Sequence, residues 1–432
     1  MLTAFRGTVC HTLGDPGESN DPAVIESFTD GILLVRDGKV ERLAPASDLL
    51  PQLGDDVELI DHRGKLLVPG FIDTHVHYPQ LDMIGSYGEQ LLEWLNNYTF
   101  PAERRFADAE HARQTAEFFL DQLLLNGTTT ALVFATVHPQ SVDALFGAAR
   151  QRSMRLVAGK VLMDRNCPDY LQDTAESGDR DSRSLIERWH GQDRLLYAVT
   201  PRFVGTSSED QLQRAGKILD DHAGVYLHTH LAENKAEIDW VAELFPDSRS
   251  YLDVYDRFAL VRERAVFAHC IHLDDQDRQR LGATGAAVAF CPTSNLFLGS
   301  GLFDLGATRA HGIRVGMGTD VGAGTSFNML QTLNEGYKVS QLRGQKLSAW
   351  RALYLATLGG AEALYLDDRL GNFMPGREAD FVVLDPAATP LLARRLNDVD
   401  DIAEQLFVLI TLGDDRAIAE TYLMGRAARP SG

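Results

Sequence analysis

Four short signals in the sequence carry residue types that bind metal ions or move protons. In chain order they are Asp73-Thr74-His75-Val76-His77, His228-Thr229-His230-Leu231-Ala232-Glu233, Ala268-His269-Cys270 and Gly318-Thr319-Asp320. Successive side chains of an extended strand alternate between its two faces, so His75 and His77 project to the same side and can bind one cation together. A single His-x-His pair is weak evidence, whereas four such signals in this order indicate a metal site.

The residue types indicate which metal could bind and which residues could bind it or move protons. Neutral imidazole suits zinc and other transition metals, and a catalytic zinc site uses about three or four protein ligands and keeps one position for water. The candidate ligands are His75, His77, His230 and Asp320. Glu233 and His269 are then left to move protons, so the six residues together could form a hydrolytic centre.

Composition indicates a globular protein and disfavours two classes of partner. The chain has 432 residues, of which 44% are hydrophobic and 24% charged, and its formal net charge is -20. A nucleic-acid backbone or an anionic membrane favours a basic surface, and no stretch of about 18 apolar residues occurs, so we expect neither partner. The four cysteines, Cys10, Cys167, Cys270 and Cys291, form no CxxC pair and no disulfide framework. That usage predicts a cytoplasmic protein.

Eight short apolar runs recur in the central part of the chain. They are Lys65–Val76, Thr128–Phe134, Arg155–Leu162, Leu195–Thr200, Val225–His230, Ala265–His269, Ala286–Phe290 and Ile313–Thr319. Stretches with helical spacing lie between them, including Glu110–Leu125, Asp210–Asp221 and Asp274–Leu281. Alternating strands and helices predict an α/β fold with a parallel sheet, here a (β/α)8 TIM barrel. Active sites of this fold lie at the carboxyl ends of the strands, where the metal-binding signals also fall.

Both chain ends differ from the central region. Residues 1–64 contain strand-like segments and turns, among which Asp37-Gly38 predicts a hairpin. Segments 379–385 and 419–425 have the same character. We therefore expect a small β-sandwich domain formed by residues 1–64 and 370–432, with the barrel domain of residues 65–369 inserted in it.

The order of the four signals resembles that of the metal-dependent amidohydrolase superfamily. Segments 67–75 (LVPGFIDTH) and 375–382 (PGREADFV) carry the same resemblance. Members of that superfamily with two metals usually bridge them with a carbamylated lysine on the fourth strand, and the fourth run here, Leu195–Thr200, contains no lysine. The resemblance therefore implies one metal ion per subunit, Zn2+ or alternatively Fe2+.

Within the superfamily, the chain resembles the guanine deaminases over nearly its whole length. The segments that carry this resemblance are Val76–Gln80, Glu93–Pro101, Asn126–Thr130 and Thr200–Phe203. The resemblance implies that a metal-activated water converts guanine to xanthine and ammonia, a reaction of purine catabolism and salvage. It also implies a homodimer.

Three residues then take catalytic roles. Glu233 is identified by the resemblance as the donor of a proton to the ring nitrogen beside C2, the carbon that the activated water attacks. Asp320, also a metal ligand, could take a proton from the water and pass it towards the departing amine. His269 would hydrogen-bond the activated water and stabilise the developing charge.

Recognition of the base needs directed hydrogen bonds and a flat apolar slot. Arg202 offers fixed donors to the O6 and N7 edge of guanine, and Gln80 has both an amide donor and an acceptor. Phe203 could cover the purine face, while Trp94 and Tyr98 either close the pocket or only pack beside it. The other residues expected to contact the substrate are His77, His230, Glu233 and Asp320.

Several alternatives stay open at the level of the sequence. The enzyme could act on another amino-heterocycle, such as 8-oxoguanine, a pterin or a triazine. A regulatory purine-binding module would bind guanine without releasing ammonia, and a non-catalytic scaffold would not need all six chemically active residues. Gln80 and Arg202 could also belong to a salt-bridged surface. His228 would lie one layer deeper than His230, so we expect it to pack in the core or to support the metal site rather than to bind the metal.

Overall fold

The computed structural model describes residues 2–88 and 90–430. Contacts divide the chain into two compact units. One consists of Met1–Asp73, Asp121–Thr130 and Phe327–Gly432, and the other of Thr74–Leu120 and Ala131–Ser326. Every residue predicted to bind metal, bind substrate or move protons belongs to the second unit, so the site is contained in one unit.

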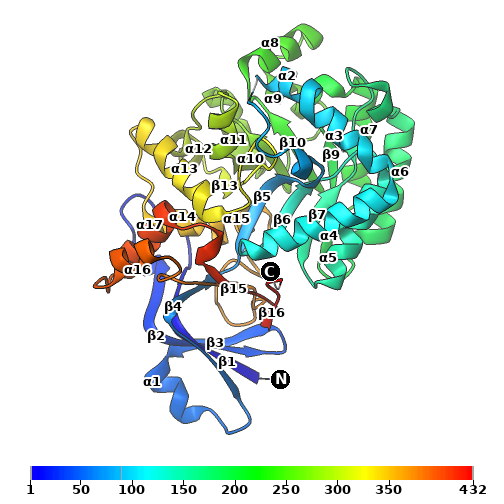
Figure 1. The fold of residues 1–432 in the computed structure, drawn as a ribbon. Helices are drawn as coiled ribbons and strands as arrows, with labels where there is room; N and C mark the ends of the chain where they lie inside the picture. Colours follow the sequence, from blue (N-terminus) through cyan, green and yellow to red (C-terminus); the bar gives the residue numbers. More distant parts are fainter. Residues whose placement is uncertain (1, 89, 431–432) are drawn as a thin grey trace. The chain divides into compact units, whose positions relative to one another are not determined.

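The predicted barrel strands lie in one sheet, in the order β13-β12-β11-β10-β9-β7-β6-β5 (Figure 1). Their bounds are β5 Phe71–His77, β6 Thr128–Phe134, β7 Arg155–Gly159, β9 Leu195–Pro201, β10 Tyr226–Leu231, β11 Ala265–His269, β12 Ala287–Phe290 and β13 Arg314–Met317. Short β8 (Val161–Leu162) also pairs with β9. Thr74 Oγ1 donates to the carbonyl oxygen of Met317 (2.9 Å), which connects the first strand to the last. The sheet is a nearly closed barrel of eight parallel strands, so the predicted TIM barrel is confirmed.

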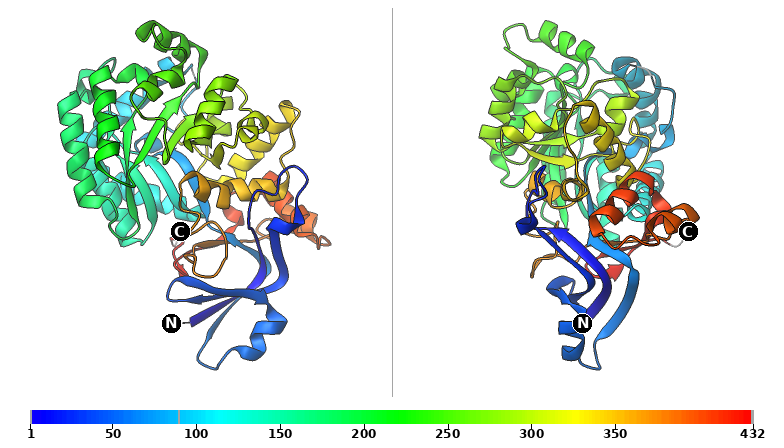
Figure 2. Two further views of the ribbon diagram at one scale, coloured as in Figure 1. Left: turned by 180° about the vertical axis from the view of Figure 1, so that it is seen from behind. Right: turned by 90° about the vertical axis from the view of Figure 1, so that its left-hand side faces the viewer.

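Helices alternate with the barrel strands along the chain. Their bounds are α2 Leu91–Trp94, α3 Phe100–Arg104, α4 Ala109–Leu125, α5 Pro139–Gln151, α6 Ala175–Trp189, α7 Glu209–Asp221, α8 Lys235–Leu244, α9 Tyr251–Arg257, α10 Asp275–Thr284, α11 Pro292–Phe297 and α12 Leu305–Ala310. The three predicted helical stretches correspond to α4, α7 and α10. Figures 1 and 2 show α6 and α7 side by side, where Arg183 Nη2 and Asp221 Oδ2 form a 2.9 Å ion pair. Among the described residues, no helix has the length and apolar character needed to cross a membrane.

The chain ends share a separate sheet of seven strands, in the order β16-β15-β14-β4-β1-β2-β3. Their bounds are β1 Leu2–Thr12, β2 Ile25–Arg36, β3 Lys39–Pro45, β4 Glu58–Pro69, β14 Phe381–Leu384, β15 Ile418–Leu423 and β16 Arg426–Ala427. The turn between β2 and β3 has positive φ at both Asp37 (50°) and Gly38 (82°), which confirms the predicted hairpin. Phe5, Phe381 and Tyr422 pack together on one face, with ring centroids 4.3 to 5.0 Å apart. The helices of this unit are α1 Ala46–Leu49, α13 Met329–Leu342, α14 Ala349–Ala356, α15 Leu358–Ala363, α16 Pro390–Leu396 and α17 Ile402–Leu412.

The structure divides the first predicted strand, Lys65–Val76, at Gly70. The residues before Gly70 complete β4 of the seven-stranded sheet, and the residues after it form β5 of the barrel. A Cβ atom at Gly70 would lie 2.1 Å from Thr129 Oγ1, so only glycine fits at this crossing. The apolar run is continuous through this point, so hydrophobicity alone does not reveal the division.

Candidate metal and substrate site

The ends of four barrel strands bring the chemically active side chains together. His75 and His77 lie on β5 and His230 on β10, while His269 is the last residue of β11 and Asp320 follows β13. All of these strands are parallel, so their carboxyl ends meet at the same end of the barrel. The clustering expected from the order of the sequence signals is therefore present.

The backbone is strained where it leaves these strands. The angle φ is 49° at Ala232, 72° at His269 and 51° at Asp320. Residues with side chains rarely adopt this left-handed region, at a cost of about 1–3 kcal/mol each, and such residues concentrate at functional sites. At Asp320 the conformation is held by a hydrogen bond from its backbone N to the carbonyl oxygen of His75 (2.9 Å).

Side-chain atoms of four residues converge on one point. His77 Nε2 lies 3.2 Å from His75 Nε2 and 3.3 Å from His230 Nε2. Asp320 Oδ1 lies 3.2 Å from His75 Nε2 and 3.3 Å from His77 Nε2. In a tetrahedral site with metal–nitrogen distances of about 2.0–2.1 Å, ligand atoms are about 3.3–3.4 Å apart. The measured separations match those of ligands around one metal ion.

Hydrogen bonds at the outer ring nitrogens direct the inner ones towards this point. His230 Nδ1 donates to the carbonyl oxygen of Arg202 (2.6 Å), which leaves Nε2 unprotonated in the neutral ring. His75 Nδ1 lies 2.7 Å from His228 Nε2, so His228 can accept the same kind of hydrogen bond when His75 carries its proton on Nδ1. Metal-binding histidines characteristically donate through their second ring nitrogen. His228 thus contacts the outer side of His75.

Burial sets the charge of the cluster. It lowers the pKa of His77 to about 3 and also lowers the pKa values of His75 and His230, so all three imidazoles are neutral. Burial acts to raise the pKa of Asp320, but His75 and His77 outweigh it and the pKa lies well below its ordinary value. Three neutral imidazoles and one carboxylate are a donor set that fits Zn2+ or Fe2+.

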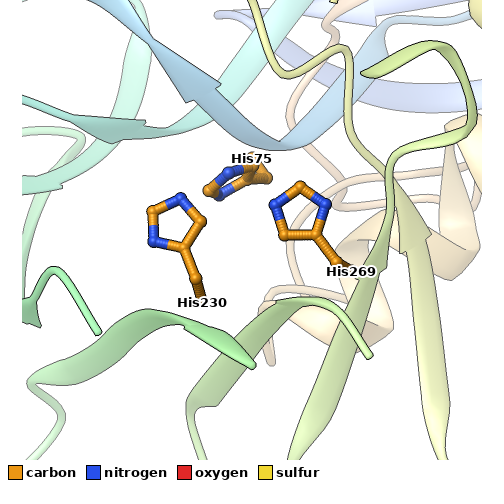
Figure 3. A group of neighbouring side chains, drawn as sticks. All are labelled: His75, His230 and His269. Carbon is orange, nitrogen blue, oxygen red and sulfur yellow. The ribbon is translucent and has the colours of Figure 1, made fainter. Parts of the chain in front are cut away.

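His269 faces the same point from another side. Figure 3 shows its ring opposite those of His75 and His230, and ligand atoms of these three residues lie within 4.8 Å of one another. Its Nδ1 donates to Asn295 Oδ1 (2.9 Å), and its Nε2 lies 3.4 Å from Glu233 Oε2 and 3.8 Å from Asp320 Oδ2. A ring nitrogen between two carboxyl groups can hydrogen-bond a water molecule held there.

Glu233 is buried beside the cluster, where its carboxyl group is easily protonated. Ser300 Oγ donates to Glu233 Oε1 (3.0 Å) and fixes the side chain. Burial, together with repulsion from the Asp320 carboxylate, raises the pKa of Glu233 to about 8. The group is therefore mostly protonated at neutral pH and can act as a proton donor.

A second buried carboxyl group, that of Glu237, supports the Glu233 segment. Its Oε2 accepts from the backbone N of Glu233 (3.1 Å) and of Asn234 (3.3 Å), and its Oε1 accepts from the Tyr251 hydroxyl (2.7 Å). Burial and the nearby Glu233 raise its pKa to about 7. Glu237 was not among the predicted site residues, although Asn234-Lys235-Ala236-Glu237 has the spacing of a helix capping box.

Several of these side chains line a cavity with about 450 Å³ of space between the atoms, part of it open to solvent. Its lining residues are His77, Gln80, Leu91, Trp94, Leu95, Thr99, Arg202, Phe203, His230, Glu233, Glu237, His269, Leu298, Asp320 and Ala323. Trp94 is thus part of the wall, and Tyr98 packs against it with ring centroids 5.1 Å apart. The lining therefore combines apolar side chains with hydrogen-bonding ones.

The three predicted base-binding side chains, Gln80, Arg202 and Phe203, all line this cavity. Gln80 and Arg202 are buried, with only 4% and 2% of each residue exposed, so they are not part of a solvated surface. Arg202 Nη1 donates to both carboxylate oxygens of Glu103 (2.9 Å each), and Gln80 Oε1 accepts from the backbone N of Gly322 (3.2 Å). Phe203 packs on Trp240 (centroids 5.8 Å apart).

A TIM barrel with histidines and an aspartate clustered at the carboxyl ends of its strands is typical of metal-dependent hydrolases. The sequence model of the amidohydrolase family matches residues 66–428. The chain therefore belongs to the amidohydrolase family.

Individual relatives match nearly the whole length of this chain. Guanine deaminase of Escherichia coli (strain K12) is 56% identical over 428 residues, which cover 98% of this chain and 97% of that protein. Among solved structures, E. coli guanine deaminase has a TM-score of 0.96 and 55% identity, and covers 98% of this chain and 99% of its own. Guanine deaminase of C. acetobutylicum, solved with guanine in its active site, has a TM-score of 0.90 and 30% identity, and the match covers 99% of this chain and 100% of that one. Within the amidohydrolase family, the chain therefore belongs to the guanine deaminases.

Proposed function

We propose that the protein catalyses the hydrolytic deamination of guanine to xanthine and ammonia. The observation that carries the proposal is one cavity bordered by a cluster that could hold a metal ion, by the easily protonated Glu233 and by the donors of Arg202 and Gln80. Deamination of a neutral amino-purine requires an activated water, a proton donor and directed hydrogen bonds to the ring. The high identity to guanine deaminases favours guanine over 8-oxoguanine, pterins and triazines.

The cavity wall supplies contacts for each part of the base. Arg202 donates to the O6 and N7 acceptors of guanine, and Gln80 meets the edge that carries both donors and acceptors. Phe203 covers one face of the purine. His77, His230, Glu233 and Asp320 border the C2 side.

Three residues move or hold protons. Protonated Glu233 donates to the ring nitrogen beside C2, which makes C2 more susceptible to attack, and it regains a proton from the added hydroxyl group when the C2 carbonyl forms and ammonia leaves. Asp320 directs Oδ1 at the histidine cluster, and its Oδ2, 3.8 Å from His269 Nε2, takes a proton from the attacking water and passes it to the departing amine. His269 holds the water in place through Nε2 and stabilises the charge that develops.

We propose one metal ion per subunit, Zn2+ with Fe2+ as the alternative, held by His75, His77, His230 and Asp320. When bound, such an ion lowers the pKa of water enough to provide a nucleophile near neutral pH. Buried Lys160, which follows β7, donates from Nζ to the carbonyl oxygen of Val161 (3.1 Å) and is paired with Asp173. This lysine is committed to an ion pair, which supports a single metal.

An ammonia-release screen tests the substrate. Purified protein loaded with Zn2+ or Fe2+ is offered guanine, 8-oxoguanine, cytosine, adenine and a pterin, and ammonia and the base product are measured. We expect release from guanine with stoichiometric xanthine. Tight guanine binding without ammonia would instead indicate a purine-binding module, and release from another base alone would transfer the proposal to that base.

We further propose that the protein is a cytoplasmic homodimer. We also propose the two domains expected from the sequence, one of residues 1–64 with 370–432 and one of residues 65–369. The four cysteines are widely spaced and form no CxxC pair, which supports a reducing compartment. The dimer rests on the likeness to the guanine deaminases. Light scattering coupled to size exclusion measures the mass in solution, and a mass of about 48 kDa, that of one chain, would contradict it.

A further inference from the structure

Glu103 lies behind the proposed base-binding wall without lining the cavity. It is on α3, its side chain is fully buried, and both of its oxygens lie 2.9 Å from Arg202 Nη1. The Gln80 side chain lies close enough to this carboxyl group to lower its pKa. The two polar side chains proposed to read the base therefore share one buried partner.

The shared partner fixes which way the Gln80 amide points. A carboxylate only accepts hydrogen bonds, so the Gln80 atom that faces Glu103 is Nε2. The contact of the amide oxygen is consistent with this orientation, because Gln80 Oε1 accepts a hydrogen bond from the backbone N of Gly322 (3.2 Å). One Nε2 hydrogen and one Oε1 lone pair are left for a ligand. Without Glu103, the amide could rotate and exchange donor for acceptor.

The same contact cancels the charge of Arg202. Its guanidinium lies over the Phe100 ring (5.4 Å to the centroid) in a buried wall, where an unpaired cation would be costly and would attract anions. Burial raises the pKa of Glu103 above its ordinary value, although Arg202, which donates to both of its oxygens, and the nearby Gln80 act in the opposite direction. The pair leaves directional donors on Arg202 with little net charge.

We propose that Glu103 is a positioning residue that makes the site selective for a neutral 6-oxo base over an anionic one. This inference rests on the proposed function. The product matters most, because xanthine has a ring N–H between two carbonyl groups and is a stronger acid than guanine. A neutralised Arg202 binds the neutral substrate through hydrogen bonds and does not retain the xanthine anion.

Steady-state kinetics of the metal-loaded enzyme test the inference. Glu103→Gln removes the charge and keeps the shape, so KM for guanine should rise about tenfold, the effect of a weakened hydrogen bond to a charged group. The inhibition constant for xanthine should fall, and fall further as the pH rises and more xanthine ionises. Glu103→Asp keeps the charge but is shorter, so it should raise KM and leave xanthine inhibition near that of the wild type. A purely structural role would not separate KM from product inhibition in this way.

Two further variants complete the design. Asp82→Asn removes the carboxylate from an exposed arginine pair, Arg105 Nη1–Asp82 Oδ2 (2.6 Å), and should change neither constant. The double variant Arg202→Met/Glu103→Gln removes both charges, so its inhibition constant for xanthine should return towards the wild-type value. This variant also provides the test if Glu103→Gln alone does not fold. Equal effects of Gln and Asp at position 103, or unchanged xanthine inhibition when the charge is removed, would overturn the inference. A wild-type enzyme that releases no ammonia from guanine would instead overturn the proposed function.

Discussion

His230 and Arg202 are joined through a single carbonyl oxygen. The Nδ1 atom and the backbone N of His230 lie 2.6 and 3.3 Å from the carbonyl oxygen of Arg202. Thr229 Oγ1 donates to the same oxygen at 3.3 Å. One backbone group therefore orients a proposed metal ligand and belongs to the residue whose side chain is proposed to bind the base. We expect substitutions at the histidines to disturb substrate binding as well as metal binding.

Glu233→Gln should leave the metal content unchanged and lower turnover by several orders of magnitude. Gln keeps the size and the contact with Ser300 but has no proton to donate, and a positioned acid contributes roughly 10²–10⁴ in rate. Metal analysis and kcat measured on the same sample check this. Glu243→Gln, an exposed change on α8, is the matched control and should be silent. Near-normal turnover of Glu233→Gln would assign the proton transfer to another group.

The protein should bind one metal ion per chain, and His75→Ala or His77→Ala should lose metal and activity together. Each substitution leaves three of the four proposed donors, and such a site holds zinc less tightly. Elemental analysis after dialysis measures the stoichiometry, with His311→Ala as a control outside the cluster. Two metal ions per chain, or a carbamylated Lys160 detected by mass spectrometry, would contradict the single-metal proposal.

Much of the site follows from rules that act locally along the chain. Strand alternation puts His75 and His77 on one face, and parallel barrel strands bring His230, His269 and Asp320 to the same end. The fold class could therefore be predicted together with the clustering of these residues. Their roles in binding and catalysis remain predictions that the experiments above test.

Other features depend on positions that only the folded chain defines. Glu103 and Arg202 are 99 residues apart, and nothing in the spacing indicates that α3 brings the carboxylate to the guanidinium. Ser300 reaches Glu233 across 67 residues in the same way. Hydrophobic patterning detects strands and helices, but it carries no information about which polar side chains pair between distant segments.

The rate should fall as the pH rises through about 8. Burial and Asp320 raise the pKa of Glu233 to about 8, so the donor is protonated below that pH and loses its proton above it. The residual rate of Glu233→Gln should lack this decline, because Gln does not titrate. Profiles of kcat against pH for both proteins provide the comparison. A wild-type rate that keeps rising above pH ~9 would be incompatible with Glu233 as the acid.

Arg202→Met should raise KM for guanine strongly and narrow the preference for guanine over 2,6-diaminopurine. A site that donates to O6 rejects a base with an amino group there, because two donors would face each other, and an unpaired buried polar group costs about 1–3 kcal/mol. Methionine removes the donor and with it the reason for rejection. Steady-state kinetics on both substrates give the ratio of kcat/KM values, and metal analysis shows that the cluster is intact. Arg105→Met, which removes an exposed arginine paired with Asp82, should leave the ratio unchanged. An unchanged ratio in Arg202→Met itself would exclude Arg202 from reading position 6, and the discrimination would have to come from Gln80 and the shape of the cavity.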